Sequence, residues 1–154
     1  MNVESLSFSD RYKSWTPYLL SILRIAVGFL FVQHGIQKIF GELESPGQPP
    51  VMSQFWIGGI LELIGGGLLI LGLLTRPIAF ILSGMMAVAY FQVHAPGSFW
   101  PIVNKGELAA LYSFVFLFFS AAGAGPISLD ALFSKEKREA SPNLTGVRSI
   151  PSAR

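Results

Sequence analysis

Four long apolar stretches, separated by short polar or turn-rich segments, dominate the pattern along the chain. They cover residues 17–40, 55–74, 77–94 and 107–124. A helix rises about 1.5 Å per residue, so about 20 apolar residues cross a hydrocarbon core of about 30 Å. The chain shows no strand-like alternation, and helices satisfy their own backbone hydrogen bonds inside lipid. The pattern therefore predicts an all-α integral membrane four-helix bundle.

The boundaries of the four stretches carry residues that end helices. Residues 41–54 hold acidic side chains and a run of Pro, Gly and Ser, which predicts an exposed loop. Pro77 suits the first turn of a helix, and residues 95–97 (Ala-Pro-Gly) end the third stretch. The chain divides into an N-terminal segment (1–16), a membrane domain (17–126) and a polar tail (127–154), for which we expect a short helix followed by disorder.

Basic residues outside the apolar stretches predict the orientation in the membrane. Four spans place both termini on one side, and eight Lys and Arg residues share that side, against only Lys38 and Lys105 on the other. The positive side of a membrane protein faces the cytoplasm. We therefore expect both termini in the cytoplasm and the loops at 41–54 and 95–105 on the outer face of a bacterial inner membrane.

Composition supports lipid as the solvent and excludes several classes of function. Hydrophobic residues make up 51% of the 154 residues, charged residues 13%, and the mean hydropathy is +0.53. With no Cys, the chain has no thiolate nucleophile, disulfide or Cys-ligated metal site. The net charge of +2 forms no basic stripe interleaved with aromatic residues, so nucleic acid is not an expected partner.

A few ionisable side chains fall within or at the ends of the apolar stretches, and they are the candidate site. Each ionised group at mid-bilayer costs roughly 2.5 to 3.5 kcal/mol even on the mildest scale, so it needs a partner or a polar cavity. The candidates are Arg24, His34, Lys38, Glu62, His94 and Glu107.

Helical geometry suggests that most of these candidates gather near the outer face. At about 100° per residue, Arg24, Phe31, Gly35 and Lys38 share one stripe, which we expect to face the interior. His34 and His94 both lie about 25 Å from the start of their helices, with Glu62 a few ångströms deeper. We expect Glu62 to pair with one of the cations on the first helix, His34, Lys38 or Arg24.

Structural roles for these residues stay open beside functional ones. Arg24 and Glu62 could serve only to hold helices together. Lys38 and Glu107 lie near helix ends, where snorkelling or the helix dipole explains them. Two histidines at one depth could ligate haem, or a metal together with carboxylates, but no Glu-x-x-His spacing supports either cofactor.

The segments around these residues resemble the DoxX family of small bacterial membrane proteins. The resemblance rests on "LRIAVGFLFVQHGIQKIFG", "GGILELIGGGLLILGLLTR", "AVAYFQVHAPGSFWP" and "NKGELAALY", in that order, and covers residues 19–130. It implies a four-helix membrane protein associated with a redox system, because the family is named for a subunit of a thiosulfate:quinone oxidoreductase. It supplies no catalytic residue, so the six candidates transfer only as characteristic polar positions.

The leading hypothesis is an inner-membrane subunit or accessory of a quinone-linked redox system that binds a small apolar ligand between helices. A quinone is the cofactor that the resemblance suggests, with membrane or soluble redox proteins as partners, and homo-oligomerisation stays open. The rival hypothesis is a membrane scaffold or assembly protein without a ligand. A small transporter is a third alternative, although no inverted repeat or broken midplane helix is evident.

Overall fold

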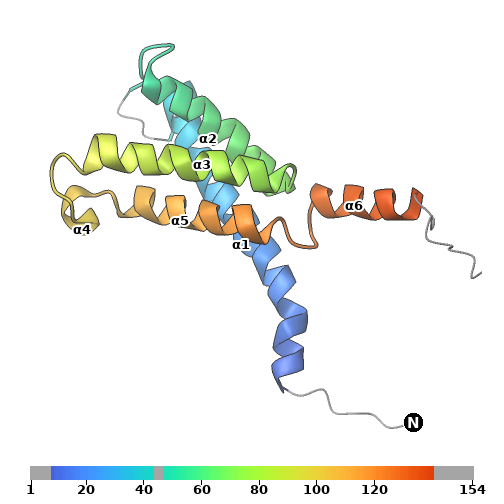
Figure 1. Cartoon of the computed structure of the whole chain (residues 1–154). Coiled ribbons are helices and arrows are strands. Elements are labelled where there is room, and N and C mark those ends of the chain that lie inside the picture. The colour runs from blue at the N-terminus through green and yellow to red at the C-terminus, as the bar shows by residue number, and fades with distance from the viewer. Residues whose placement is uncertain (1–7, 44–46, 141–154) are drawn as a thin grey trace, which may run out of the picture.

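The computed structural model describes residues 8–43 and 47–140, and these residues form helices and connections without strands. The chain is therefore an all-helical membrane bundle, as predicted (Figure 1). In order, the helices are α1 (Phe8–Phe40), α2 (Gln54–Leu71), α3 (Thr75–Ala89), the π-helix η1 (Tyr90–His94), α4 (Pro101–Asn104), α5 (Glu107–Ala122) and α6 (Leu129–Ala140).

Within the described residues, three helices are long and apolar enough to cross a membrane. They are Tyr12–Phe40, Gln54–Leu71 and Thr75–His94, the last combining α3 and η1. The fourth apolar helix, α5, has 16 residues and is therefore about 24 Å long. It is shorter than a typical span, yet it packs along α3 as an integral part of the bundle.

The bundle is built from two helix pairs. Helix α1 packs mainly on α2, and α3 packs mainly on α5, which lies beside it while α1 crosses the bundle and extends beyond it (Figure 1). Phe31 of α1 joins the pairs, because its ring meets Tyr112 and Phe116 of α5 edge-on at centroid distances of 5.1 and 4.8 Å. Phe31 and Phe116 are both fully buried, so this aromatic contact lies at the centre of the core.

Glycines bring α1 and α2 close together at two levels. A Cβ on Gly35 would lie 2.6 Å from the backbone N of Leu63, and one on Gly28 would lie 3.0 Å from the carbonyl O of Gly66. Such backbone contact is available only to residues without a side chain, and it is a common way to pack membrane helices. Not every glycine of α2 makes such a contact, because a Cβ on Gly58 or Gly67 would meet nothing within 4 Å among the described residues.

The two ends of the bundle differ in construction. The loop end holds the connecting residues 41–43, 47–53 and 95–106, and the tail end holds the α2–α3 turn and the α5–α6 connection. At the tail end, the left-handed Gly72 closes α2, with its N–H and that of Leu73 donating to Leu69 and Leu68. Asp130 then accepts from the N–H groups of Leu74 and Thr75, at 2.8 and 2.9 Å, and so caps α3 from a distant part of the sequence.

Several helix bounds differ from the ends of the predicted spans. Helix α1 begins at Phe8, before the apolar stretch, and includes Pro17. Helix α2 ends at Leu71, three residues early, since Gly72 takes the left-handed conformation. The third helix ends in a π turn, in which Ala95 N donates to Tyr90 O at 2.9 Å.

The expected short helix after residue 127 is present as α6, which points away from the bundle in Figure 1. The disorder expected beyond it falls on residues 141–154, outside the described residues. The division into segments 1–16, 17–126 and 127–154 stays a prediction, although α1 runs across the first boundary.

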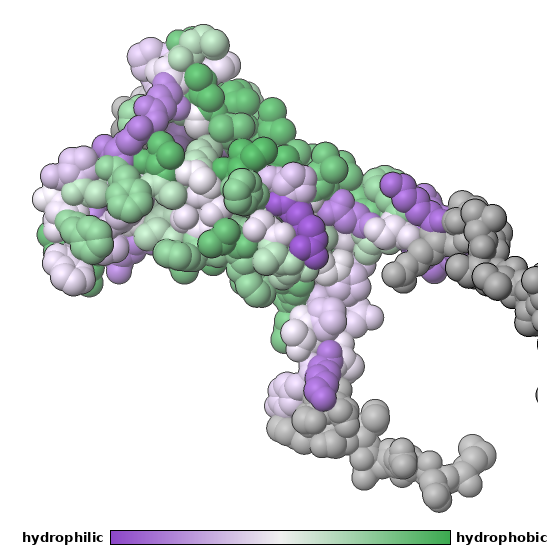
Figure 2. Space-filling model, viewed as in Figure 1, coloured by the Kyte–Doolittle hydropathy of each residue, from purple (hydrophilic) through white to green (hydrophobic). Residues whose placement is uncertain are grey.

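The outer surface of the bundle is apolar. Figure 2 shows hydrophobic side chains over much of the visible bundle, with hydrophilic ones at the loop end, towards α6 and on the N-terminal part of α1. Large residues such as Phe80, Phe114 and Phe118 are more than half exposed. A surface of this kind is stable when lipid covers it.

Candidate functional site: a polar cavity at the loop end

A cavity of about 260 Å³ opens at the loop end of the bundle between α1, α2, α3 with η1, and α5. Seven apolar residues line it: Phe31, Phe55, Met86, Ala89, Val93, Leu108 and Ala109. Six polar residues complete the lining: His34, Lys38, Glu62, His94, Lys105 and Tyr112. Ligand sites combine an apolar wall with a few convergent polar groups, and this cavity has that composition.

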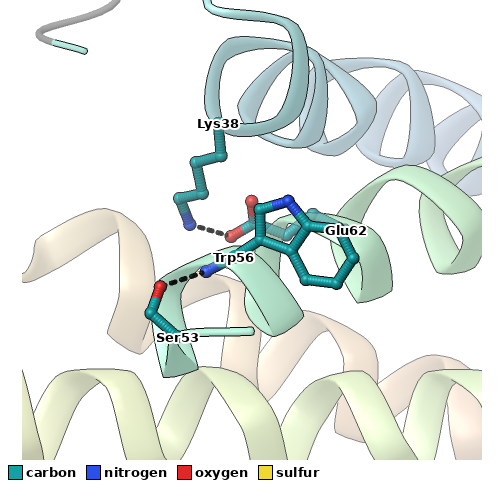
Figure 3. Close-up of polar contacts among 4 residues, drawn as sticks. All are labelled: Lys38, Ser53, Trp56 and Glu62. Atoms are coloured by element: carbon teal, nitrogen blue, oxygen red, sulfur yellow. Dashed lines mark hydrogen bonds and ion pairs between the residues drawn. The ribbon is translucent and has the colours of Figure 1, made fainter. Parts of the chain in front are cut away.

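An ion pair between α1 and α2 forms one wall of the cavity. Lys38 Nζ donates to Glu62 Oε1 at 2.6 Å, and Figure 3 shows the two side chains pointing toward each other from neighbouring helices. The Glu62 side chain is 4% exposed and that of Lys38 is 32% exposed. Lys38 is therefore the partner of Glu62 among the three cations that the sequence left open.

Glycine spacing explains why this ion pair forms. Gly35 lies three residues before Lys38, and Gly59 lies three residues before Glu62, so each charge follows a close-contact glycine by about one helical turn. At Gly59, a Cβ would lie 2.9 Å from Cβ of Lys38. The helix backbones are thus close enough for a short, direct contact between the two side chains.

The π turn and the loop after it fix the position of His94. His94 Nδ1 lies 3.1 Å from the carbonyl O of Asn104. Asn104 is itself held, because its side-chain amide donates to Ser98 O at 2.6 Å and accepts from Gly106 N at 2.7 Å. A Cβ on Gly106 would lie 2.8 Å from Cβ of His94, so the loop packs directly against the imidazole side chain.

His34 approaches the cavity from α1. Its ring meets Tyr112 of α5 edge-on, with centroids 6.2 Å apart, and Tyr112 stacks on Phe116 at 5.5 Å. Four of the six predicted residues, His34, Lys38, Glu62 and His94, therefore line one cavity.

Arg24 does not belong to this cluster and lies at the opposite end of the bundle. The fully buried guanidinium donates from Nε to Ala124 O and from Nη1 to Ile70 O, both at 2.9 Å, and it also bonds Leu69 O and Ile127 O. Arg24 is therefore not the partner of Glu62. Backbone carbonyls at helix ends carry partial negative charge, so they neutralise a cation without any carboxylate contact.

Glu107 also lies outside the cavity. It is exposed in the first turn of α5, where a carboxylate interacts favourably with the helix dipole. No group of three or more His, Asp or Glu side chains gathers in the described part of the chain to hold a metal ion.

Sequence reasoning missed two polar members of the lining, Tyr112 and Lys105, and the supporting role of Asn104. Tyr112 had a detectable signal, because it follows Ala109 and precedes Phe116 at helical spacing on the buried face of a Phe-rich helix. Lys105 and Asn104 begin the segment "NKGELAALY" that carries the family resemblance, but their placement beside the cavity depends on how the loop before α5 folds.

A larger hollow of about 550 Å³ lies at the tail end between α3, α5 and α6. Two of its charged groups already bind backbone: Arg76 donates to the last carbonyls of α5, including Ser120 O at 3.1 Å, and Asp130 caps α3. Because Arg76 and Asp130 hold neighbouring helices together, we assign this hollow to helix packing. The loop-end cavity is therefore the candidate site.

Comparison with known proteins places most of the candidate polar residues within one family pattern. The sequence profile of the DoxX family matches residues 19–95, half of the chain. The chain belongs to the DoxX family. Arg24, His34, Lys38, Glu62 and His94 all fall inside the matched region, and Glu107 falls beyond it.

Two relatives of this DoxX protein extend the comparison to most of its length. A Haemophilus influenzae protein described as uncharacterized is 43% identical over 137 residues, covering 82% of this chain and 99% of the relative. An uncharacterized membrane protein of Mycobacterium tuberculosis is 30% identical over 138 residues, covering 77% and 83%. No solved structure matches the chain. The second relative is named as a membrane protein, and neither name gives a ligand.

Proposed function

We propose that this DoxX-family protein holds a small apolar molecule of the quinone class in the loop-end cavity, as an accessory of a quinone-linked redox system in the bacterial inner membrane. The observation that carries the proposal is the convergence of Lys38, Glu62, His34 and His94 on one largely apolar cavity. A quinone needs such a site, with an apolar wall for its ring and polar groups for its oxygens.

The size of the cavity supports a single ring as the bound group. About 260 Å³ lies just below the usual range for ligand pockets, so the cavity holds a substituted ring and no long tail. Phe55, Val93 and Leu108 line the cavity and are each about half exposed on the apolar surface. An attached apolar tail would leave past these side chains into lipid.

The absence of Cys from the sequence limits what the protein does itself. Electron transfer would belong to the bound ligand and to a partner protein, while the cavity binds and orients the ring. The protein is therefore proposed as a binding subunit, with His34 and Glu62 as groups that could exchange protons with the ring.

The test is the lipid extract of full-length protein purified in mild detergent. We expect quinone in molar excess over the lipid background of a mock preparation. Ala89→Leu should abolish the excess by filling the cavity, whereas Ala26→Leu, on the exposed face of α1, should retain it. Equal quinone content in both variants and in the mock preparation would refute the proposal.

The scaffold hypothesis has its own support in α6. This helix points away from the bundle and exposes Lys135, Lys137 and Glu139 (Figure 1). Under this hypothesis Lys135→Glu with Lys137→Glu would remove a co-purifying protein, and Ala89→Leu would not. The reverse pattern would favour the ligand-binding function.

A further inference from the structure

We propose that the loop-end cavity selects ligands that donate hydrogen bonds, so that a hydroquinone or phenol binds more tightly than the acceptor-only quinone or ether of the same skeleton. This inference rests on the proposed function and specifies which form of the ring the site prefers. It follows from the hydrogen-bonding state of two side chains in the cavity wall.

Glu62 supplies the first acceptor. The residue is 3% exposed, and its Oε1 atom accepts from Lys38 at 2.6 Å. Its other oxygen, Oε2, is buried and has no hydrogen-bond partner among the described residues. A buried acceptor without a donor is unfavourable, so a ligand that brings an O–H or N–H group to Glu62 gains binding free energy.

His94 supplies the second acceptor. Its Nδ1 atom faces the carbonyl O of Asn104 at 3.1 Å, and a carbonyl oxygen only accepts, so Nδ1 carries the proton. In the neutral imidazole, Nε2 is then an acceptor on a side chain that lines the cavity. The bonds from Asn104 to Ser98 and Gly106 hold this carbonyl in place and so maintain the tautomer.

The lysine donors that line the cavity can form hydrogen bonds without a ligand, unlike the buried oxygen of Glu62. Lys38 has one donor committed to Glu62, and its side chain is one-third exposed, so its remaining N–H groups can reach polar headgroups or water. Lys105 is exposed. A quinone carbonyl can therefore bind these lysines or the hydroxyl of Tyr112, but only a donor relieves the buried oxygen of Glu62. The result is a preference for the hydroxylated ring and not an absolute requirement.

The experiment compares matched ligands on full-length protein in lipid nanodiscs by isothermal titration calorimetry. One pair is trimethylhydroquinone and trimethylbenzoquinone, titrated without oxygen. The other is 4-propylphenol and its methyl ether, which differ in the donor and undergo no redox change. We expect the donor of each pair to bind about tenfold more tightly or better.

Variants identify the side chain responsible. Glu62→Gln replaces the carboxylate by an amide that also donates, so the preference should fall well below tenfold, to the share that His94 contributes. Glu107→Gln makes the same chemical change at an exposed glutamate outside the cavity and should leave the preference intact. If Glu62→Gln does not fold, the phenol and ether comparison on the unmodified protein still decides the question.

The outcomes separate the inference from the proposed function. Equal affinity within each pair, or tighter binding of the quinone and the ether, would overturn the donor preference while the ligand site stands. Absence of binding by all four compounds to folded protein would overturn the ligand site itself. A tenfold preference that survives Glu62→Gln unchanged would overturn the assignment to Glu62.

Discussion

Lys38 on α1 and Glu62 on α2 form an asymmetric ion pair, joined at 2.6 Å, in which the carboxylate is almost fully buried and the ammonium is one-third exposed. The asymmetry matters because the two partners differ in what happens when the pair is broken. An orphaned Lys38 can extend toward the membrane surface, whereas an orphaned Glu62 stays inside the bundle.

We therefore expect Lys38→Met to destabilise the protein more than Glu62→Gln. Removing one partner of a buried pair costs roughly 3 to 5 kcal/mol, and Lys38→Met should approach the lower value because it leaves a buried carboxylate alone. Unfolding of purified protein by SDS in mixed micelles measures the difference. The double variant Lys38→Met/Glu62→Gln should recover part of the loss. Equal stability of both single variants and the unmodified protein would mean that the pair contributes nothing.

Arg24→Lys should be strongly destabilising despite keeping the charge. The planar guanidinium of Arg24 reaches carbonyls of α2 and of the segment after α5 together, and an ammonium lacks that fork of donors. We expect a loss of more than about 3 kcal/mol, since hydrogen bonds from a charged group contribute about 1.5 to 3 kcal/mol each. Arg76→Lys, at an exposed arginine, is the matched control and should have a small effect.

The same Arg24 variant distinguishes a structural role from a functional one. Because Arg24 lies at the tail end, protein that survives purification should bind cavity ligands with unchanged affinity. A large loss of affinity in folded Arg24→Lys protein would place this residue in the ligand site after all.

Two glycines of the α1–α2 pair should respond oppositely to alanine. Gly35→Ala places a Cβ 2.6 Å from backbone N of Leu63, so the helices must separate, at a cost of about 1 to 3 kcal/mol. Gly67→Ala meets no atom of the described residues within 4 Å and should be neutral or stabilising by up to about 1 kcal/mol, because alanine favours the helix. Thermal stability in detergent compares them, and similar losses in both variants would contradict the close-contact assignment.

The orientation of the protein can be tested by cysteine labelling, since the natural sequence has no Cys. We expect Ser98→Cys, at the loop end, to react with an impermeant maleimide added outside intact inner membrane. Ser134→Cys on α6 should react only after the membrane is opened, because the distribution of basic residues predicts a cytoplasmic tail. The opposite labelling pattern would reverse the predicted topology.

Helix content, membrane character and the inward stripe of α1 could be predicted from the sequence alone. Hydropathy and the 3.6-residue period are local properties, so they suffice to assign Phe31 and Gly35 to the buried face of α1. Helix rise predicted similar depths for His34 and His94, and both line the loop-end cavity. The family could also be predicted from the sequence, because its characteristic residues occur in short segments that follow one another in a fixed order.

Choice among partners was beyond the sequence, because it depends on which helices touch and at what height. Glu62 had three candidate cations on α1, and the close contact of Gly35 and Gly59 selected Lys38. Arg24 instead donates to the backbone carbonyls of Leu69, Ile70, Ala124 and Ile127. Every residue carries a backbone carbonyl, so no sequence pattern marks these four as partners. The capping of α3 by Asp130, about 55 residues away in sequence, has the same origin: a hydrogen bond acts over about 3 Å in space, and sequence separation says nothing about that distance.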